Sequence, residues 1–320
     1  MSRKLVTVFS LLEDHHRAAI RSAAERAGFD AFFFDRDEDA FPALAGAEII
    51  FSQSAALIAH APALKWFCTP FAGVDYLTDN EAFLSGRAVL SNSSGAYGVT
   101  IAEHIVMVVL EMLRRQPEYN DMVLRREWSR SLPVRSVRNS RIVLLGTGNI
   151  GQEAALRLRA FGPAGLTGIS RSGRNPGERF DRVLRQSALD SVLPECDILI
   201  CSIPATRETA GMLDARRLSL LPDQALVVNV GRGSLIDEAA LEKELRTGRL
   251  LAALDVFGRE PLPAESSLWA CPNLLLTPHV AGNMTLPYTR DRIVSLFLED
   301  FENWCADRPL LRRVDMKLGY

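Results

Sequence analysis

Short apolar runs alternate with amphipathic and polar stretches along most of the chain. In the first third of the sequence, each run is bounded by polar or glycine-bearing turns. Runs of this length predict buried strands, and their alternation with helical patterns is typical of a parallel sheet covered by helices. The strands predicted here are residues 4–9, 31–34, 48–52, 64–68 and 88–90.

One amphipathic helix is predicted within this part, from Glu13 to Ala27. Gly28 follows it, at the position where a glycine commonly ends a helix in the left-handed conformation. The alanines Ala18, Ala19, Ala23 and Ala27 are predicted to lie on one side of this helix.

A longer and more apolar helix is predicted from Val99 to Arg115, ending before Pro117. Because its apolar side chains extend almost all round it, we expect this helix to be buried between domains or subunits. His104 lies within it and is interpreted as a packed core or interface residue. The polar run that continues to Arg138, and that contains Trp128, is predicted to be a loop or arm.

The alternation of apolar runs and helical patterns continues through the second half of the chain. Helices are predicted at 215–221 and 238–247, and Gly248 ends the second one. The strands predicted in this part are residues 142–145, 166–170, 197–202, 225–230, 251–256 and 274–276.

A last amphipathic helix is predicted at 289–306, and we expect it to return to the N-terminal unit. Its apolar side carries Ile293, Leu296, Phe297 and Phe301. The predicted fold is therefore α/β, with two Rossmann-like, doubly wound parallel-sheet domains, one inserted into the other. The outer domain is predicted to comprise residues 1–98 plus 286–320, and the inserted domain residues 99–285.

Composition narrows the class of protein. Hydrophobic residues make up 48% and charged residues 24% of the chain, as in globular proteins, and the net charge is only −2. A nearly balanced charge argues against nucleic acid or an anionic membrane as the partner. No apolar stretch has the length of a membrane span or of an export signal, so the sequence predicts a cytoplasmic protein.

The cysteines do not predict a metal site or a disulfide framework. Their number is 5, which is odd, and their spacing is not that of metal ligands. Cys196 and Cys201 flank a predicted strand and are interpreted as small buried apolar residues in a reducing compartment. No metal ligand is therefore predicted.

The stretch RIVLLGTGNIG, from Arg141 to Gly151, carries the clearest chemical signal. A predicted strand, a G-x-G-x-x-G loop and a predicted helix follow one another, which is the dinucleotide-binding fingerprint. Its glycines allow a tight turn, close approach of a pyrophosphate and helix–strand packing, and the first helical amides face the phosphates. The residues predicted to bind the dinucleotide are Gly146, Gly148, Asn149, Ile150 and Gly151.

The end of the next predicted strand indicates which dinucleotide binds. A carboxylate there usually accepts hydrogen bonds from the adenosine ribose of NAD, but this chain has Ser-Arg-Ser-Gly-Arg. Guanidinium groups favour a 2′-phosphate, so the sequence predicts a preference for NADP(H), with NAD(H) possible. The alternative is a solvated basic surface loop. The residues predicted to contact the 2′-phosphate are Ser170, Arg171, Ser172 and Arg174.

Three ionisable residues lie just past predicted strands, at the edge where open α/β sheets bind their ligands. Arg232 lies between two glycines, Glu260 precedes a proline, and His279 follows one. Each has an ordinary alternative when it is considered alone: a loop ion pair, a surface acid and a turn residue.

Together, the motifs resemble those of the D-isomer-specific 2-hydroxyacid dehydrogenase family. The sequences NVGRG at 229–233, LDVFGREPLP at 254–263 and TPHVAG at 277–282 follow the fingerprint in the family's order. Residues 72–75 and 95–104 are similar to the family's substrate loop and interdomain helix. The resemblance covers nearly the whole chain, and it implies a flavodoxin-like substrate domain around an inserted NAD(P)-binding domain.

The resemblance implies a role for each ionisable residue. Arg232 would bind the substrate carboxylate and polarise the adjacent carbonyl, because its planar group donates two parallel hydrogen bonds. His279 would transfer a proton to or from the substrate oxygen, and Glu260 would orient its imidazole.

The same resemblance implies further contacts. Backbone amides of Ala72, Gly73 and Val74 would bind the other oxygen of the substrate carboxylate. The remaining residues implied at the cofactor are Ile203, Pro204, Thr209, Val230, Gly231, Asp255 and His279, with Asp255 orienting the nicotinamide amide.

The predicted cofactor preference and the resemblance together imply NADPH-dependent reduction of a 2-keto acid to the D-2-hydroxy acid, as in glyoxylate/hydroxypyruvate reductases. A bulky or aromatic 2-keto acid is an equal alternative to glyoxylate or hydroxypyruvate as the substrate. A corepressor-like nucleotide-sensing scaffold and a phosphoglycerate dehydrogenase-like enzyme remain alternatives, whereas Glu260 argues against formate oxidation. A homodimer through the cofactor domain is also predicted. Residues that neighbour the motifs and could line a side-chain pocket, or belong to the core instead, are Phe71, Tyr97, Trp269, Met284, Leu286 and Tyr288.

Overall fold

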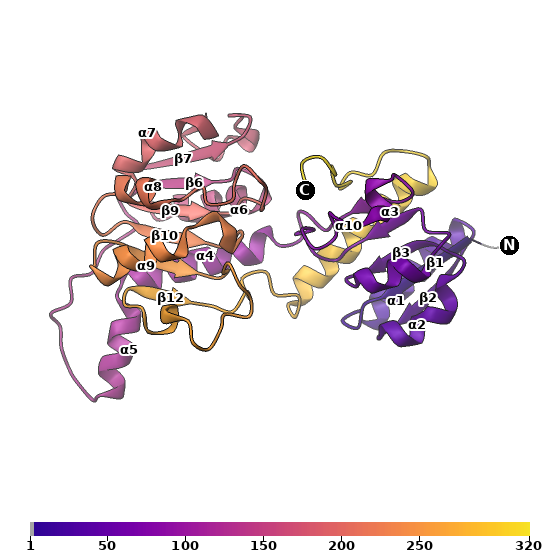
Figure 1. Ribbon diagram of the computed structural model, residues 1–320, viewed down its shortest axis with the longest axis horizontal. Helices are drawn as coiled ribbons and strands as arrows, with labels where there is room; N and C mark the ends of the chain where they lie inside the picture. The colour runs from indigo at the N-terminus through magenta and orange to yellow at the C-terminus, as the bar shows by residue number, and fades with distance from the viewer. Residues whose placement is uncertain (1–2) are drawn as a thin grey trace. The chain divides into compact units, whose positions relative to one another are not determined.

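The computed structural model describes residues 3–320, and the chain divides into two compact units (Figure 1). The first unit is formed by the segment up to Tyr97 together with Asn283–Tyr320, and the second is Gly98–Gly282. The second unit begins one residue before its predicted start at 99 and ends three residues before its predicted end at 285. Each unit has its own parallel sheet, so the predicted α/β class with one domain inserted into another is confirmed.

The sheet of the first unit has the strand order β2-β1-β3-β4-β5, with every neighbouring pair parallel. This is the flavodoxin-like order of doubly wound folds. All the strands predicted in this part are present. They are β1 (Arg3–Val8), β2 (Phe29–Phe34), β3 (Ala47–Ser52), β4 (Trp66–Cys68) and β5 (Val89–Ser91).

The helices of the first unit only partly match the prediction. The buried side of α1 carries His16, Ile20, Ala23 and Ala24, whereas Ala18 and Ala19 are exposed, so the four alanines named from the sequence do not share one environment. The larger side chain Ile20 sets the buried side, because it removes more apolar area from water than an alanine does. The helices are α1 (Asp14–Arg26), α2 (Asp37–Leu44), α3 (Glu81–Leu84) and α10 (Pro287–Cys305), and α2 and α3 were not predicted.

Helix α10 completes the core of the first unit, as predicted. Its residue Phe297 stacks on Phe51 with ring centroids 4.3 Å apart and also lies against Trp66 at 5.5 Å. Phe301 meets Phe29 of β2 edge-on at 5.4 Å. The C-terminal segment therefore supplies aromatic side chains that cover the N-terminal sheet.

Two histidines of α1 contact one carboxylate of α10. The Nε2 atom of His16 lies 2.8 Å from Asp291, and His15 lies 3.2 Å from the same oxygen. These three groups lie close enough to hold a metal ion. However, the backbone N–H of Glu13 donates to Nδ1 of His16, so the proton of a neutral ring is on Nε2. We therefore interpret the group as a hydrogen-bonded link between helices.

The sheet of the second unit has the order β12-β11-β10-β9-β6-β7-β8, and all its neighbouring pairs are parallel. Strands β7 and β8 are added on one side of β6, and β9 to β12 are added on the other side. The position between β6 and β9 is therefore the switch point, where doubly wound sheets bind ligands. The strands are β6 (Arg141–Leu145), β7 (Gly165–Ser170), β8 (Arg182–Arg185), β9 (Ile198–Cys201), β10 (Leu226–Asn229), β11 (Leu251–Leu254) and β12 (Leu274–Leu276). Strand β8 was not predicted.

Apart from α5, the helices of the second unit contact the strands of this sheet or share a buried apolar cluster with them. The run up to Arg138 was predicted to be a loop, but α5 forms within it and buries none of its residues. The helices are α4 (Gly98–Leu113), α5 (Gln116–Leu124), α6 (Asn149–Arg159), α7 (Leu189–Val192), α8 (Ala215–Leu220) and α9 (Glu238–Arg246). Short 3₁₀ helices of the two units are Ala55–His60, Pro176–Glu178, Gln186–Ala188, Leu193–Glu195, Gly233–Leu235 and Ser267–Ala270.

Two further predictions concern the interior and the membrane. Cys196 and Cys201 are fully buried, as predicted, and burial raises the pKa of the Cys196 thiol to about 12. Among the described residues, none of the helices combines the length and the apolar character that crossing a bilayer requires. The cytoplasmic location stays a prediction.

Candidate active site

The fingerprint loop connects β6 to α6 in the second unit, and its glycines are required by close packing. Gly146 has φ +113°, and a Cβ there would lie 2.8 Å from the Ser202 hydroxyl. A Cβ on Gly151 would lie 2.1 Å from the Gly146 carbonyl oxygen. A side chain at either position would clash with these atoms and displace the turn. Close packing therefore requires glycine at 146 and at 151.

The third glycine has a different environment. A Cβ on Gly148 would meet no described protein atom within 4 Å, so its absence keeps space open in front of the loop. Gly148 is also the N-cap of α6, and no side chain accepts a hydrogen bond from the first amides, those of Asn149 and Ile150, in the described chain. Free helical amides facing open space fit a pyrophosphate, because they present donors and the positive end of the helix dipole.

The loop after β7 is held by its own serines. The Ser170 hydroxyl accepts a hydrogen bond from the Gly173 amide at 3.0 Å, and the Ser172 hydroxyl accepts one from the Arg174 amide at 3.3 Å. Gly173 has φ +69°, so the chain turns sharply between the two arginines. Both hydroxyls predicted to contact a phosphate therefore also shape the turn.

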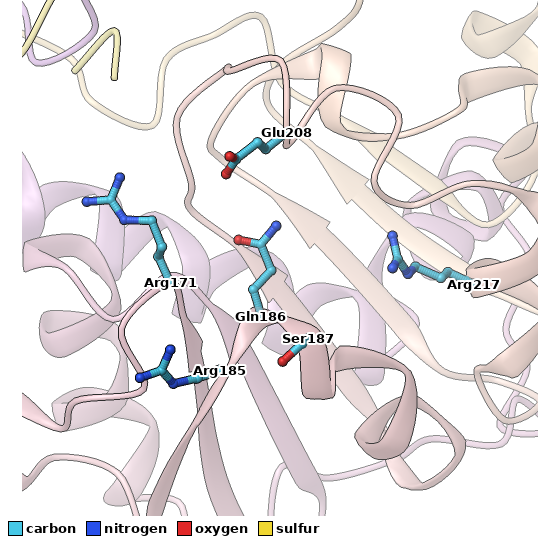
Figure 2. Close-up of a pocket in the computed structure, with 6 residues that line it drawn as sticks. All are labelled: Arg171, Arg185, Gln186, Ser187, Glu208 and Arg217. Carbon is cyan, nitrogen blue, oxygen red and sulfur yellow. The ribbon is translucent and has the colours of Figure 1, made fainter. Parts of the chain in front are cut away.

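A pocket of about 340 Å³ lies beside this loop (Figure 2). Its lining side chains are Arg171, Arg185, Gln186, Ser187, Glu208 and Arg217. Of the four residues predicted at the 2′-phosphate, only Arg171 is in this set. Arg185 is the last residue of β8 and was not predicted to have a role in binding.

The loop after β9 packs against the fingerprint. A Cβ on Gly146 would lie 3.1 Å from Ile203, and a Cβ on Gly231 would lie 2.7 Å from the Ile203 carbonyl oxygen. The hydroxyl of Thr209 donates to the Pro204 carbonyl at 2.7 Å and accepts from the Thr206 amide at 2.8 Å. Thr209 thus organises the loop that presents Ile203 and Pro204.

Arg232 is placed by the residues around it. The buried side chain of Asn229 donates to the Arg232 carbonyl at 2.9 Å and accepts from the Gly231 amide at 3.0 Å, closing the turn after β10. A Cβ on Gly233 would lie 1.9 Å from the backbone of Phe257. The glycines on either side of Arg232 therefore let its loop pack directly on the two neighbouring loops.

His279 and Glu260 form a close pair. Their side chains approach to 2.6 Å, between Nδ1 of the imidazole and one carboxylate oxygen. The other oxygen of Glu260 accepts a hydrogen bond from the Phe257 amide at 2.9 Å. Since a carboxylate only accepts, Nδ1 carries a proton, and Nε2 is the atom left for a substrate. About half of the His279 side chain is exposed, so the imidazole is accessible.

The backbone at His279 is also constrained. Its φ of 53° lies in the left-handed region, which a non-glycine residue rarely adopts. Its amide lies 2.9 Å from the Asp255 carbonyl and 3.0 Å from that of Thr277. Strained backbone of this kind is often found at functional sites, where the surrounding structure holds a side chain in place.

The carboxylate of Asp255 fixes the rest of this turn. It is 2% exposed and accepts hydrogen bonds from the amides of Val280 at 2.9 Å and Ala281 at 3.0 Å. The Thr277 hydroxyl donates to it at 2.7 Å. Three of its roughly four acceptor positions are thus filled from within the protein, which leaves one for an external donor such as an amide N–H.

His104 extends this network from α4. The Thr277 hydroxyl donates its proton to Asp255. Its oxygen therefore accepts a hydrogen bond from Nε2 of His104, which lies 3.3 Å away. Burial is the main effect that lowers the pKa of His104 below its usual value of 6.5. The prediction of a packed histidine did not include this link, because Thr277 is 173 residues away in the sequence.

The residues implied in substrate binding from the first unit follow β4. The carbonyl of Ala72 accepts a hydrogen bond from the Asn92 side chain at 2.8 Å, and Val74 is buried. Over residues 3–320, the amides of Ala72, Gly73 and Val74 donate to no protein acceptor. They therefore remain able to bind an anion.

The predicted side-chain pocket residues differ in environment. Tyr97 is buried and its hydroxyl donates to the Pro70 carbonyl at 2.7 Å, so it belongs to the core of the first unit. Leu286 and Tyr288 are exposed in the first unit, and Trp269 is exposed in the second. A role for the exposed three, and for Phe71 and Met284, stays a prediction.

The similarity to known proteins extends over the whole chain. Residues 106–281 match the family model of the D-isomer specific 2-hydroxyacid dehydrogenase NAD-binding domain. Glyoxylate/hydroxypyruvate reductase B of Serratia proteamaculans is 32% identical over 264 residues, which cover 79% of this chain and 80% of that protein.

Two solved structures have the same fold. A D-isomer specific 2-hydroxyacid dehydrogenase family protein from Aeromonas salmonicida has a TM-score of 0.86 and 33% identity, covering 99% of this chain and 100% of that one. An NADPH-dependent glyoxylate/hydroxypyruvate reductase from Sinorhizobium meliloti, in complex with NADP and sulfate, has a TM-score of 0.83 and 26% identity over 99% and 100%. The chain is therefore an oxidoreductase that belongs to the D-isomer specific 2-hydroxyacid dehydrogenase family.

Proposed function

We propose that the protein reduces a small 2-keto acid to the D-2-hydroxy acid and prefers NADPH as its cofactor. The observation that carries this proposal is the 2.6 Å pair of His279 and Glu260, in the same unit as the fingerprint. The names of the Serratia and Sinorhizobium relatives support glyoxylate or hydroxypyruvate as the substrate. The first unit would be the substrate domain and the second the cofactor domain.

The nicotinamide cofactor supplies the hydride when it is bound. Arg232 would bind the carboxylate of the keto acid and polarise the adjacent carbonyl, because its guanidinium donates two parallel hydrogen bonds to such a group. The amides of Ala72, Gly73 and Val74 would bind the other carboxylate oxygen from the first unit.

His279 would give its Nε2 proton to the carbonyl oxygen as the hydroxyl forms. Glu260 accepts the hydrogen bond from Nδ1, and it holds the ring in the orientation that presents Nε2. Asp255 would accept a hydrogen bond from the nicotinamide amide with its remaining lone pair. Val230 and Gly231, together with Ile203, Pro204 and Thr209, would line the cofactor.

A panel of 2-keto acids tests the proposal. The purified protein is assayed with NADPH and with NADH on glyoxylate, hydroxypyruvate, pyruvate, phenylpyruvate and 3-phosphohydroxypyruvate. We expect the highest kcat/KM for glyoxylate or hydroxypyruvate with NADPH. Exclusive turnover of the phosphorylated acid would replace the proposal by a biosynthetic role, and no turnover of any acid would refute it.

We also propose that two chains associate through the second unit. Helix α5 and the residues after it expose apolar side chains, including Leu124 at 82% and Trp128 at 90%, which water would otherwise contact. A dimer is expected by light scattering at micromolar concentration. Trp128→Ser should weaken it, and a monomeric wild-type protein would contradict the proposal.

A further inference from the structure

We propose that Arg185 is the second cation of the subsite for the 2′-phosphate of NADP(H) and acts together with Arg171. This inference rests on the cofactor preference proposed above. The proposal differs from the sequence prediction in the residues that bind the 2′-phosphate, because Arg185 replaces Arg174 as the partner of Arg171.

The pairing of β7 and β8 brings the two arginines to one edge of the sheet. The strands are parallel, and Ser170 at the end of β7 is the register partner of Arg185 at the end of β8. Arg171 is the next residue after Ser170. Both arginines line the pocket of about 340 Å³, and Figure 2 shows them on one side of it, opposite Arg217. In dinucleotide-binding folds the adenosine ribose lies at the end of this second strand.

The arginines of the pocket are not equally available. Arg217 binds Asp190 and the Met212 carbonyl, each at 2.7 Å, so its charge is paired and two of its donors are used. Within residues 3–320, the guanidinium of Arg185 has neither an ion pair nor a hydrogen bond. A phosphate monoester carries about −1.5 to −2 charges at neutral pH, so a single arginine would leave part of its charge unbalanced.

Gly173 holds the arginine loop against the side chain of Arg185. A Cβ on Gly173 would lie 3.0 Å from Cγ of Arg185, and the Gly173 amide is bound by the Ser170 hydroxyl. The stem of Arg185 therefore passes directly under the turn that carries Arg171. This contact limits the directions in which the guanidinium can extend, and a partly ordered side chain loses less entropy on binding.

Another part of the pocket wall carries a negative charge. Glu208, on the loop after β9, faces the pocket and would repel a phosphate on its own side. Attraction by Arg171 and Arg185 and repulsion by Glu208 act in the same direction, so the phosphate is expected between the two arginines. Arg174 is exposed and does not line the pocket in the described chain, which is why we expect it to contribute little.

Binding of adenosine nucleotides tests the proposal without turnover. Calorimetry compares 2′,5′-ADP with 5′-ADP for the wild type and for Arg185→Gln, Arg171→Gln, Arg174→Gln and Arg182→Gln. Arg182 is a matched control, because it begins the same strand, carries the same charge and is bound to the Thr167 hydroxyl. We expect Arg185→Gln to weaken 2′,5′-ADP about tenfold or more, as for the loss of a charged hydrogen bond, and to leave 5′-ADP within about twofold.

Each other outcome overturns a different statement. If Arg171→Gln weakens 2′,5′-ADP but Arg185→Gln binds it like the Arg182→Gln control, the role of Arg185 is refuted and the NADPH preference stands. If the wild type binds 2′,5′-ADP no better than 5′-ADP, the preference fails and this inference with it. In that case, turnover of a keto acid with NADH would still support the proposed reduction, although not the proposed preference for NADPH.

Discussion

The two ends of the proposed cofactor site are built in different ways. At the end that carries His279, a strained backbone, a 2.6 Å contact to Glu260 and the buried Asp255 carboxylate fix one imidazole in place. At the other end, Arg171 and Arg185 extend exposed side chains into a pocket beside a loop whose turn is held by the hydroxyls of Ser170 and Ser172. The first end depends on geometry and the second on charge.

This difference follows from what each end has to do. Proton transfer requires the acid within hydrogen-bond reach of one atom, and small displacements reduce the rate strongly. Recognition of a phosphate tolerates several arrangements of flexible cations, because Coulomb attraction falls slowly with distance. Changes at the first end should therefore affect kcat, and changes at the second end should affect cofactor affinity.

The largest expected effect comes from His279→Asn. The variant keeps the size of the side chain but cannot donate a proton as an imidazolium does, so kcat for keto acid reduction should fall about 10²–10⁴-fold. Stopped-flow or steady-state assays measure kcat, and fluorescence titration should give an unchanged Kd for NADPH. His60→Asn, at an exposed position of the first unit, is the control. Full activity of the His279 variant would show that its constrained geometry serves only the fold.

A smaller effect is expected from salt, and it should act at the arginine end. The Debye length falls to about 8 Å at physiological ionic strength and to about 3 Å at 1 M, so exposed charges are progressively screened. Raising NaCl should weaken NADPH binding several-fold more than NADH binding, while kcat at saturating cofactor stays nearly constant. Fluorescence titrations at a series of salt concentrations measure both affinities. Equal salt dependence for the two cofactors would mean that the arginines do not distinguish them.

The smallest effect concerns the pH dependence of stability at the His279 end. Burial lowers the pKa of His104 in the folded state below 6.5, so below pH 6.5 the unfolded chain binds more protons than the folded one. Stability should therefore decrease as the pH falls from 6.5 towards the folded pKa. Urea unfolding at pH 5 and pH 7.5 should show a larger loss for the wild type than for His104→Gln. An identical loss of unfolding free energy in both proteins would contradict the lowered pKa of His104.

The sequence predicted the interior of the fold better than its edges. Strands with continuous apolar runs, such as Leu226–Asn229, were found because both faces of a central parallel strand are buried. Strand β8 was missed because it lies at the edge of its sheet and has an arginine at each end. Helix α5 was missed because it buries no residue, so no apolar stripe marks it.

The same limit applies to the site. Arg232, Glu260 and His279 could be predicted, since each is part of a short motif with glycine or proline. Thr277 could not, because its partner His104 is 173 residues away in the sequence. The proposed role of Arg185 could not either, because strand pairing brings this residue beside Ser170. Residues that act through tertiary contacts leave no local pattern.

The return of α10 to the N-terminal sheet has a consequence for synthesis on the ribosome. Strands β1–β5 leave the ribosome early, but Phe297 and Phe301, which pack against Phe51 and Phe29, come from the end of the chain. The continuous unit Gly98–Gly282 can complete its core first, since domains generally fold as units during translation. Until α10 emerges, we expect the aromatic face of the nascent sheet to stay uncovered, so the first unit completes its core after the second.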